Sequence, residues 1–473
     1  MSFTDLGVPA RLATVLSERG ITEPTPIQAA TLPDSLSGRD VLGRGRTGSG
    51  KTYAFLLPLV ARLVESGKPR TAKRPRALIL APTRELVGQI KESLDPMASE
   101  FGLTVQTVFG GVGQNPQVQG LRKGVDIVLA CPGRLEDLMG QGHCDLGAVE
   151  ITILDEADHM ADLGFLPGVR RIMEKTPERG QRLLFSATLD NGINVLVKRF
   201  LHNQVTHEAD SAQSPVSTMD HHVLHLARDH RLPVLVDLAS APGRTVVFTR
   251  TKHGAKALAR QLNKNGVPSV ELHGNLSQGA RTRNMEAFHS GAATTLVATD
   301  IAARGIHVDD VALVVHADPP AEHKAYLHRS GRTARAGASG TVVTLMTDEQ
   351  VRDVRDLTRA AGIKPTITKV DGPRHPVLTT LAPGARVLVD GGYVAEAAGS
   401  GATAPRSGGQ QRSRRPRSGA GTGGGAGARN GARNGGGKGS GNGTGSSNGS
   451  GNGSGRSRRR GGRGGASRPH ASA

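Results

Sequence analysis

"ITILDEAD", residues 151–158, joins four residues suited to a buried strand to three carboxylates packed into four positions. Asp155, Glu156 and Asp158 follow the apolar run directly. Carboxylates this close repel one another, so they need a positive partner. The stretch therefore predicts a ligand-binding loop at the end of a buried strand rather than a solvated acidic turn.

Short apolar runs of the same kind alternate with helical patterns along the chain. In the first half, predicted strands lie at 76–81, 125–129, 151–154 and 182–187, with a helix-compatible stretch at 83–94. The plan restarts with apolar runs at 245–249, 294–299 and 311–316. Strands that alternate with helices indicate βαβ units and a parallel sheet covered on both faces. The sequence thus predicts two α/β domains in tandem, joined near residue 212.

Composition limits the class of protein. A chain of 473 residues is long enough for two or three domains. Its two cysteines, Cys131 and Cys144, have no companion pair for a disulfide framework or a zinc site, so we expect reduced thiols. No apolar run approaches the roughly 20 residues of a membrane span, and the N-terminus lacks the plan of a signal peptide. We expect a soluble, cytoplasmic protein.

The C-terminal tail, residues 399–473, consists mainly of Gly, Ser, Asn and Arg. Residues 401–473 contain fourteen Lys or Arg and no acid, so the tail carries most of the net charge of +19. With hardly an aliphatic side chain larger than Ala, this segment cannot bury enough apolar surface to offset its ordering entropy. The composition predicts a disordered basic tail.

The positive partner of the acids is predicted by "GRTGSGKT", residues 45–52, which matches a phosphate-binding loop. Its glycines let backbone N–H groups surround a phosphate, and the following helix presents its positive end. We expect Lys51 to reach the β- and γ-phosphates, and Thr52 and Asp155 to hold Mg²⁺. Glu156 would orient or deprotonate the attacking water. Asp158 is left for another partner.

Together with further motifs in a fixed order, these stretches resemble the DEAD-box ATP-dependent RNA helicases over roughly residues 3 to 350. The similar stretches are "GITEPTPIQ" (20–28), "GRTGSGKT", "APTREL" (81–86), "GG" (110–111), "CPGR" (131–134), "DEAD", "SAT" (186–188), "VFTRT" (247–251), "LHGNLSQ" (272–278), "ATDIAARGIHV" (298–308) and "HRSGRTARAG" (328–337). The resemblance implies two RecA-like domains, with ATP and Mg²⁺ as cofactors.

The resemblance also assigns nucleotide-binding residues. Phe3 and Gln28 would contact the adenine, and His307 stands where the family has an Asp that holds the ribose. Arg332 and Arg335 would act as arginine fingers from the second domain, so that the ATP-binding site is completed only when the domains close. The expected phosphate contacts are Thr47, Gly48, Ser49, Gly50, Lys51 and Thr52.

Coupling and RNA contacts are implied in the same way. His328 is similar to the family histidine that contacts the last acid, here Asp158, while Ser186 and Thr188 would link hydrolysis to strand separation; read alone, the two hydroxyls also suit ordinary caps. Backbone contacts to RNA should be tolerant of sequence. They fall on Pro82, Thr83, Arg84, Gly110, Gly111, Pro132, Gly133, Arg134, Gly274 and Thr299.

Several positions depart from the family pattern. At 307 an imidazole cannot accept from two hydroxyls as a carboxylate can, so we expect nucleotide affinity to depend less on the ribose, with Asp309 or Asp310 as substitutes. Cys131 lacks the hydroxyl that is frequent there. Milder departures are Ile21, Gly45, Arg46 and Ala334.

These features predict an ATP-dependent RNA helicase that separates short duplexes or remodels ribonucleoprotein. The alternative is an ATP-gated RNA clamp or assembly platform with little unwinding; a DNA helicase fits the motifs less well. The tail suits a non-specific RNA anchor or, alternatively, a solubilising extension. The expected domains are 1–208, a linker at 209–217, 218–372, a connecting segment at 373–398 and the tail at 399–473.

Overall fold

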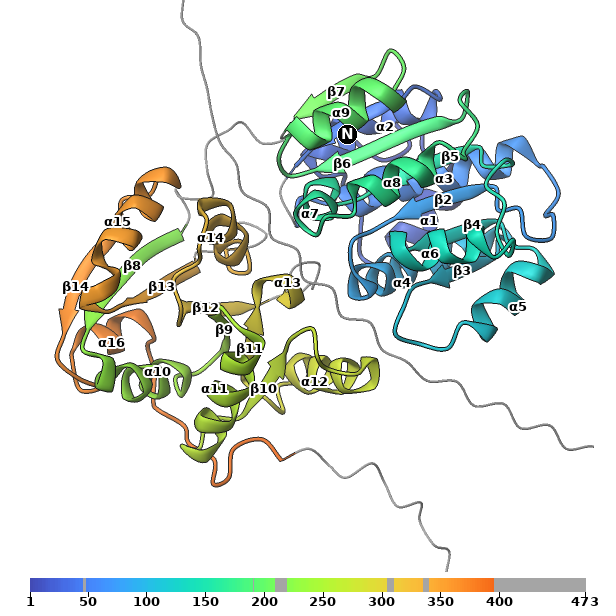
Figure 1. Ribbon diagram of the computed structural model, residues 1–473. Coiled ribbons are helices and arrows are strands. Elements are labelled where there is room, and N and C mark those ends of the chain that lie inside the picture. The colour runs from blue at the N-terminus through green and yellow to red at the C-terminus, as the bar shows by residue number, and fades with distance from the viewer. Residues whose placement is uncertain (46–47, 190, 209–218, 304–309, 335–339, 395–473) are drawn as a thin grey trace, which may run out of the picture. The chain divides into compact units, whose positions relative to one another are not determined.

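The computed structural model describes residues 1–45, 48–189, 191–208, 219–303, 310–334 and 340–394 (Figure 1). Four residues with expected roles, Thr47, His307, Asp309 and Arg335, lie outside the described residues, as do the expected linker and the tail. In the described part, the strands form two seven-stranded sheets in which every pairing is parallel.

The first lobe contains one sheet with strand order β3-β4-β2-β5-β6-β1-β7. The strands are β1 (Val41–Arg44), β2 (Ala77–Leu80), β3 (Val105–Val108), β4 (Ile127–Ala130), β5 (Ile151–Leu154), β6 (Gln181–Ser186) and β7 (Val205–Glu208). Every residue of β2, β4 and β5 is buried, as expected for central strands covered on both faces. The register aligns Leu80, Leu154 and Leu184 across neighbouring strands.

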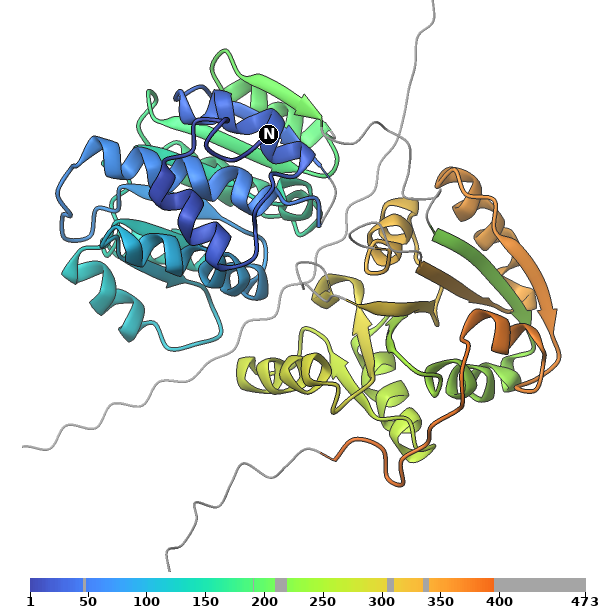
Figure 2. The same cartoon turned by 180° about the vertical axis from the view of Figure 1, so that it is seen from behind.

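Helices cover both faces of this sheet. One hydrophobic core joins it to α1 (Ala10–Glu18), α2 (Pro26–Leu36), α3 (Lys51–Ser66) and α4 (Arg84–Glu100). The other core joins it to α5 (Asn115–Lys123), α6 (Pro132–Gly140), α7 (Ala157–Asp162), α8 (Leu166–Met173) and α9 (Asn191–Phe200). Figure 1 shows α6 and α8 in front of the sheet, and Figure 2, seen from behind, brings the blue N-terminal helices forward. The predicted α/β layers of the first lobe are confirmed.

The second lobe has the strand order β10-β11-β9-β12-β13-β8-β14. Its strands are β8 (Met219–Leu226), β9 (Arg244–Thr249), β10 (Ser269–Leu272), β11 (Thr295–Thr299), β12 (Val311–His316), β13 (Gly340–Met346) and β14 (Thr366–Val370). The apolar runs expected at 245–249, 294–299 and 311–316 are β9, β11 and β12, within one residue. The second parallel sheet is therefore confirmed as well.

Two cores cover the faces of the second sheet. One contains α10 (Arg231–Ala239), α11 (Lys252–Lys264) and α16 (Val377–Leu381). The other contains residues of α12 (Gln278–Ser290), α13 (Asp300–Ala303), α14 (His323–Ser330) and α15 (Val351–Ala360). Short 3₁₀ turns, η2 (Arg228–His230) and η3 (Asp348–Gln350), precede α10 and α15.

Cys131 and Cys144 are free thiols. Burial raises the pKa of each thiol to about 12, so neither carries a reactive thiolate near neutral pH. Among the helices that the structure describes, none combines the length and hydrophobicity needed to cross a bilayer.

Candidate active site

The loops of the first lobe that carry the candidate residues meet at one edge of its sheet. The carboxyl ends of parallel strands share an edge, so strand order decides which loops are neighbours. The phosphate loop follows β1, the acids follow β5, and β6, which ends at Ser186, lies between them. With strands about 4.8 Å apart, the two loops start roughly 10 Å from each other. This distance leaves room for phosphate groups between them.

In the phosphate loop, Gly50 caps α3 in the left-handed conformation, with φ of +93°. A Cβ here would lie 2.5 Å from Thr25 Oγ1, so only glycine fits. Lys51 is buried, and its Nζ donates to the carbonyl oxygen of Gly45 at 2.7 Å. The hydroxyl of Ser49 is buried and has no hydrogen-bond partner among the described residues. Ser49 and Lys51 are thus donors that a phosphate could engage, and Thr52 follows in the first turn of α3.

Gln28 connects the stretch "GITEPTPIQ" (20–28) to the phosphate loop. Its Oε1 accepts from the backbone N–H of Thr25 at 2.9 Å, and its Nε2 donates to the carbonyl oxygen of Gly50 at 2.8 Å. Each end of this buried amide makes one hydrogen bond, so Oε1 keeps a second lone pair and Nε2 a second hydrogen with which it could contact an adenine. Phe3 is only 3% exposed and packs in the hydrophobic core.

The first two acids of "DEAD", Asp155 and Glu156, are both buried, but their pKa values are shifted in opposite directions. Burial raises the pKa of Asp155 to about 7, against the opposing effect of the nearby Lys51. Burial alone would also raise the pKa of Glu156, but a hydrogen bond from His159 and nearby positive charge outweigh it and lower this pKa to about 2. Glu156 is thus held as a carboxylate at neutral pH. A residue that is to accept a proton from water must be in this deprotonated form.

Asp158 links the acidic loop to "SAT". Its Oδ2 accepts from the backbone N–H of Thr188 at 2.9 Å and from the Thr188 hydroxyl at 3.0 Å. The Ser186 hydroxyl donates to the Thr188 carbonyl oxygen at 2.7 Å and accepts from the Asp158 N–H at 3.2 Å. The partner that the sequence left open for Asp158 is, in the first lobe, Thr188. The contact expected from His328 stays a prediction.

The candidate RNA contacts of the first lobe follow β2, β3 and β4, on the other half of the same edge. Thr83 caps α4, its hydroxyl accepting from the N–H of Leu86 at 3.3 Å. The Arg84 guanidinium packs on Gly111, where an added Cβ would lie 2.2 Å from Arg84 Nη1. Arg134 donates from Nη1 to the carbonyl oxygen of Val112 at 3.3 Å. These contacts bring the three stretches 82–84, 110–111 and 132–134 together, with the guanidinium groups of Arg84 and Arg134 among them.

In the second lobe, the candidates likewise follow neighbouring strands. Gly274 comes after β10 with open space where a Cβ would be, and Thr299 ends β11. Arg332, 4% exposed, follows α14 and donates from Nε to the carbonyl oxygen of His328 at 3.4 Å. Ala334 has φ of +53°, a conformation that costs roughly 1–2 kcal/mol outside glycine. The departure from glycine at 334 therefore carries backbone strain.

Two interactions near these motifs were missed by sequence reasoning. The imidazole Nδ1 of His159 lies 3.1 Å from Glu156 Oε2. Spacing i, i+3 was the available signal, because such side chains share a helix face. In the second lobe, Arg329 binds the Asp300 carboxylate through Nε and Nη2, at 2.5 and 2.7 Å, and so anchors α14.

The residues of the candidate site fit a Mg²⁺ ion that is bound together with the phosphates of a nucleotide. Among the described residues, no group of three or more His, Cys, Asp or Glu could hold a metal by itself. Mg²⁺ commonly takes one or two protein ligands together with phosphates and water, which matches the Thr52 hydroxyl and the Asp155 carboxylate. A buried carboxyl with a raised pKa is also one whose charged form a cation would stabilise.

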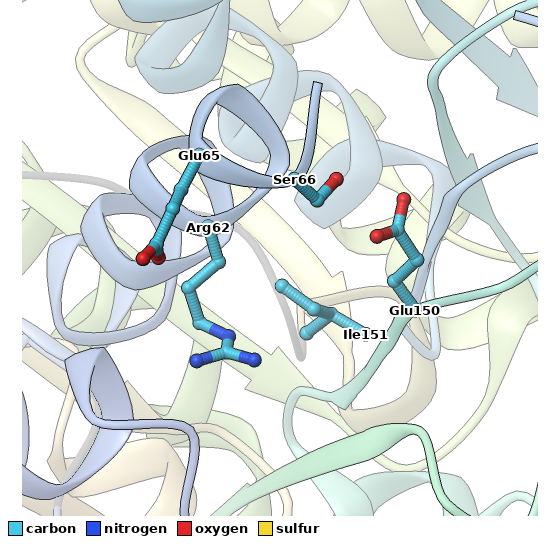
Figure 3. A pocket seen from close by; sticks show the side chains of 5 residues that line it. All are labelled: Arg62, Glu65, Ser66, Glu150 and Ile151. Atoms are coloured by element: carbon cyan, nitrogen blue, oxygen red, sulfur yellow. The ribbon is translucent and has the colours of Figure 1, made fainter. Parts of the chain in front are cut away.

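A pocket of about 350 Å³ opens at the opposite end of α3. It is lined by Arg62, Glu65, Ser66, Glu150 and Ile151 (Figure 3). Ser66 ends α3 and Ile151 begins β5, so this pocket lies at the amino edge of the sheet, away from the phosphate loop. It shares no residue with the candidate active site.

Two protein-family models match this chain, one in each lobe. The model of the DEAD/DEAH box helicases matches residues 25–195, and that of the helicase conserved C-terminal domain matches residues 228–337. Two tandem parallel-sheet lobes with a phosphate loop and acidic strand end define a nucleotide-binding protein of the RecA-like class. The chain belongs to the DEAD-box RNA helicase family.

Individual relatives agree with this assignment. The chain is 39% identical to the chloroplastic DEAD-box ATP-dependent RNA helicase 3B of Zea mays, over 76% of this chain and 49% of that protein. It is 36% identical to the ATP-dependent RNA helicase RhlB of Erwinia tasmaniensis, over 81% and 90%. The structure of S. cerevisiae Dbp5 bound to RNA and ADP BeF3 matches with a TM-score of 0.69 and 28% identity, over 78% and 95%. The chain spans about half the length of the maize relative.

Proposed function

We propose that this protein is an ATP-dependent RNA helicase: RNA stimulates hydrolysis of ATP, and hydrolysis is coupled to closure of the lobes and local separation of short duplexes. The observation that carries the proposal is the sheet edge of the first lobe. There, "SAT" lies between the phosphate loop and the acids and is bonded to Asp158. Membership of the family and the printed activities of the maize and Erwinia relatives support it.

In the proposed reaction, the phosphate loop binds and orients the triphosphate. Lys51 exchanges its bond to the Gly45 carbonyl for phosphate oxygens, and Ser49 gains the partner that its buried hydroxyl lacks. Mg²⁺, held by Thr52 and Asp155, would neutralise charge on the phosphates. Glu156 orients the attacking water or accepts its proton. Arg332 stabilises the charge that develops on the γ-phosphate, together with Arg335, which lies outside the described residues.

RNA is proposed to bind in the first lobe at Arg84, Gly111 and Arg134, which lie together, and in the second lobe at Gly274 and Thr299. These groups are guanidinium ions, backbone and a hydroxyl, so they suit the sugar-phosphate backbone rather than base edges. The RNA in the Dbp5 structure supports this class of ligand. The basic tail is proposed to add non-specific affinity for RNA, and ribonucleoproteins are proposed as partners.

The domain limits 1–208 and 218–372 are also proposed from the sequence, as is a cytoplasmic location. The printed names of relatives include chloroplastic and mitochondrial proteins, so the location needs its own test by fractionation.

A gel assay for release of a labelled strand from a short RNA duplex tests the function. With ATP we expect release, and with a non-hydrolysable analogue only binding. RNA-stimulated ATP hydrolysis without strand release would favour the alternative, an ATP-gated RNA clamp. Absence of RNA-stimulated hydrolysis by the full chain would refute the helicase, and absence of ATP-dependent RNA binding would refute the clamp as well.

A further inference from the structure

His159 and Glu156 form a buried contact inside the acidic loop. The two side chains are 4% and 12% exposed, and His159 Nδ1 lies 3.1 Å from Glu156 Oε2. Glu156 caps the N-terminus of α7, and His159 lies on the first turns of that helix. The imidazole therefore reaches back to the carboxylate from a helix that the second core of the first lobe holds in place.

The chemistry of the two groups fixes the direction of this hydrogen bond. An ionised carboxylate only accepts, so Nδ1 of His159 must carry the hydrogen. The other ring nitrogen, Nε2, is buried and has no hydrogen-bond partner in the described part of the chain. Leaving a buried polar atom unpaired costs roughly 1–3 kcal/mol. The free-energy cost of the unpaired Nε2 is thus tolerated at this site while Nδ1 donates to Glu156.

The backbone at Glu156 is also strained. Its φ of +49° is unusual for a residue with a side chain, and such strain is concentrated at functional sites. The N–H of Glu156 donates to Asp155 Oδ1 at 3.0 Å, which fixes the main chain. The three side-chain torsions of a glutamate still leave its carboxylate free to move unless a second contact restrains it. His159 supplies that contact.

We propose that His159 is a positioning residue for ATP hydrolysis: it holds Oε2 of Glu156 so that Oε1 faces the attacking water. The inference rests on the proposed function, because it gives Glu156 the role of orienting that water. In this proposal His159 acts only through Glu156. Its loss should therefore lower kcat and leave the KM for ATP unchanged.

Two polar substitutions of His159 separate the contact from simple packing. In His159→Asn the amide nitrogen takes the place of Nδ1 and can still donate to Glu156. In His159→Gln the longer side chain places its nitrogen near the position of Nε2, so the donor is misplaced. His159→Leu removes the donor and keeps an apolar side chain of similar size. Thermal unfolding of all three reports whether the fold is intact.

RNA-stimulated ATP hydrolysis of the full chain, measured with saturating single-stranded RNA, tests the proposal. We expect His159→Gln and His159→Leu to lower kcat about tenfold, since small misplacements of a reacting group cost factors of this size. His159→Asn should retain more than half of wild-type kcat. Equal losses in Asn and Gln variants that fold normally would overturn the proposal, as would a change in KM alone.

A double-mutant cycle with Glu156→Gln provides the second criterion. If His159 acts through Glu156, adding His159→Leu to Glu156→Gln should lower kcat no further. Additive losses would assign His159 a different role and refute the inference. The proposed function fails separately: in that case the wild-type chain itself shows no RNA-stimulated hydrolysis.

Discussion

Asp158 and Thr188 are joined by two hydrogen bonds, from the backbone N–H and the hydroxyl of Thr188 to the same carboxylate oxygen, at 2.9 and 3.0 Å. They connect the loop after β5, which carries the proposed water-orienting residue, to the loop after β6. This direct link between the two loops is the observation on which we base the proposal that "SAT" is a coupling element rather than an ordinary strand end.

Removing the Thr188 hydroxyl should uncouple unwinding from hydrolysis. Thr188→Val keeps the shape and the backbone bond but loses the 3.0 Å bond to Asp158. We expect strand release to fall at least tenfold, which is the size of effect expected from the loss of one hydrogen bond to a charged group. RNA-stimulated ATP hydrolysis should stay within about threefold of wild type. Thr188→Ser, which keeps the hydroxyl, is the matched control. A parallel decrease in both activities would contradict the coupling role.

Lys51 should be essential for hydrolysis. Its ammonium group is buried at the phosphate loop, and Lys51→Met removes this charge while filling similar space. We expect phosphate release to fall by roughly 100-fold or more, because stabilisation of phosphate charge is lost. Circular dichroism should show an unchanged fold. Substantial hydrolysis by this variant would mean that the motif at 45–52 is not the catalytic phosphate loop.

Gly111→Ala should weaken RNA binding specifically. With φ of +77° and Arg84 Nη1 only 2.2 Å from the new Cβ, the substitution strains the backbone and displaces the guanidinium. Loss of one phosphate contact should lower affinity about tenfold and reduce the salt slope by roughly one. Gly113→Ala, which meets nothing within 4 Å, is the control. Fluorescence anisotropy with labelled RNA measures both; equal affinities for the two variants would exclude Arg84 as a contact.

The second lobe should lose stability in mild acid. Burial lowers the pKa of His221 to about 4 and holds that of His316 well below its ordinary value. In the unfolded chain each histidine takes up a proton near pH 6.5, so lowering the pH below 6.5 favours unfolding until the folded pKa is reached. Between pH 7.5 and 5.5 each should cost roughly 1 kcal/mol.

Urea unfolding of wild type and His221→Gln at the two pH values tests this. The variant loses the bond of 3.1 Å between His221 Nδ1 and the Tyr326 hydroxyl, so it should be less stable at pH 7.5. Its stability should nevertheless depend less on pH, because one group no longer titrates. An identical pH dependence would show that His221 is protonated equally in both states.

Deleting residues 399–473 should weaken RNA binding at low salt, since fourteen positive charges are lost. ATP hydrolysis at saturating RNA should stay near wild type, because the proposed catalytic residues precede the tail. A full-length variant with the tail arginines changed to glutamine separates charge from length. If RNA affinity is the same with and without the tail, the anchor is refuted and the solubilising alternative stands.

Much of the fold follows from local patterns. The apolar runs predict β5 and β12 to the residue, because a parallel strand that is mostly or entirely buried is a continuous apolar run bounded by polar residues. Strands such as β3, β7 and β14 are partly exposed and mixed in composition, so periodicity did not reveal them. Their place at or near the sheet edges depends on pairing with distant strands.

By itself, the sequence determined the α/β class, the phosphate loop and the chemical kinds of side chain at the proposed site, because these depend on short stretches of neighbouring residues. Only the tertiary structure decided which groups touch: that Asp158 binds Thr188, that Gln28 holds the Gly50 carbonyl, and that His159 holds Glu156. Hydrogen-bond geometry, burial and the resulting pKa values depend on strand order and on side-chain packing. Those quantities are set by the whole lobe and are not contained in any single motif.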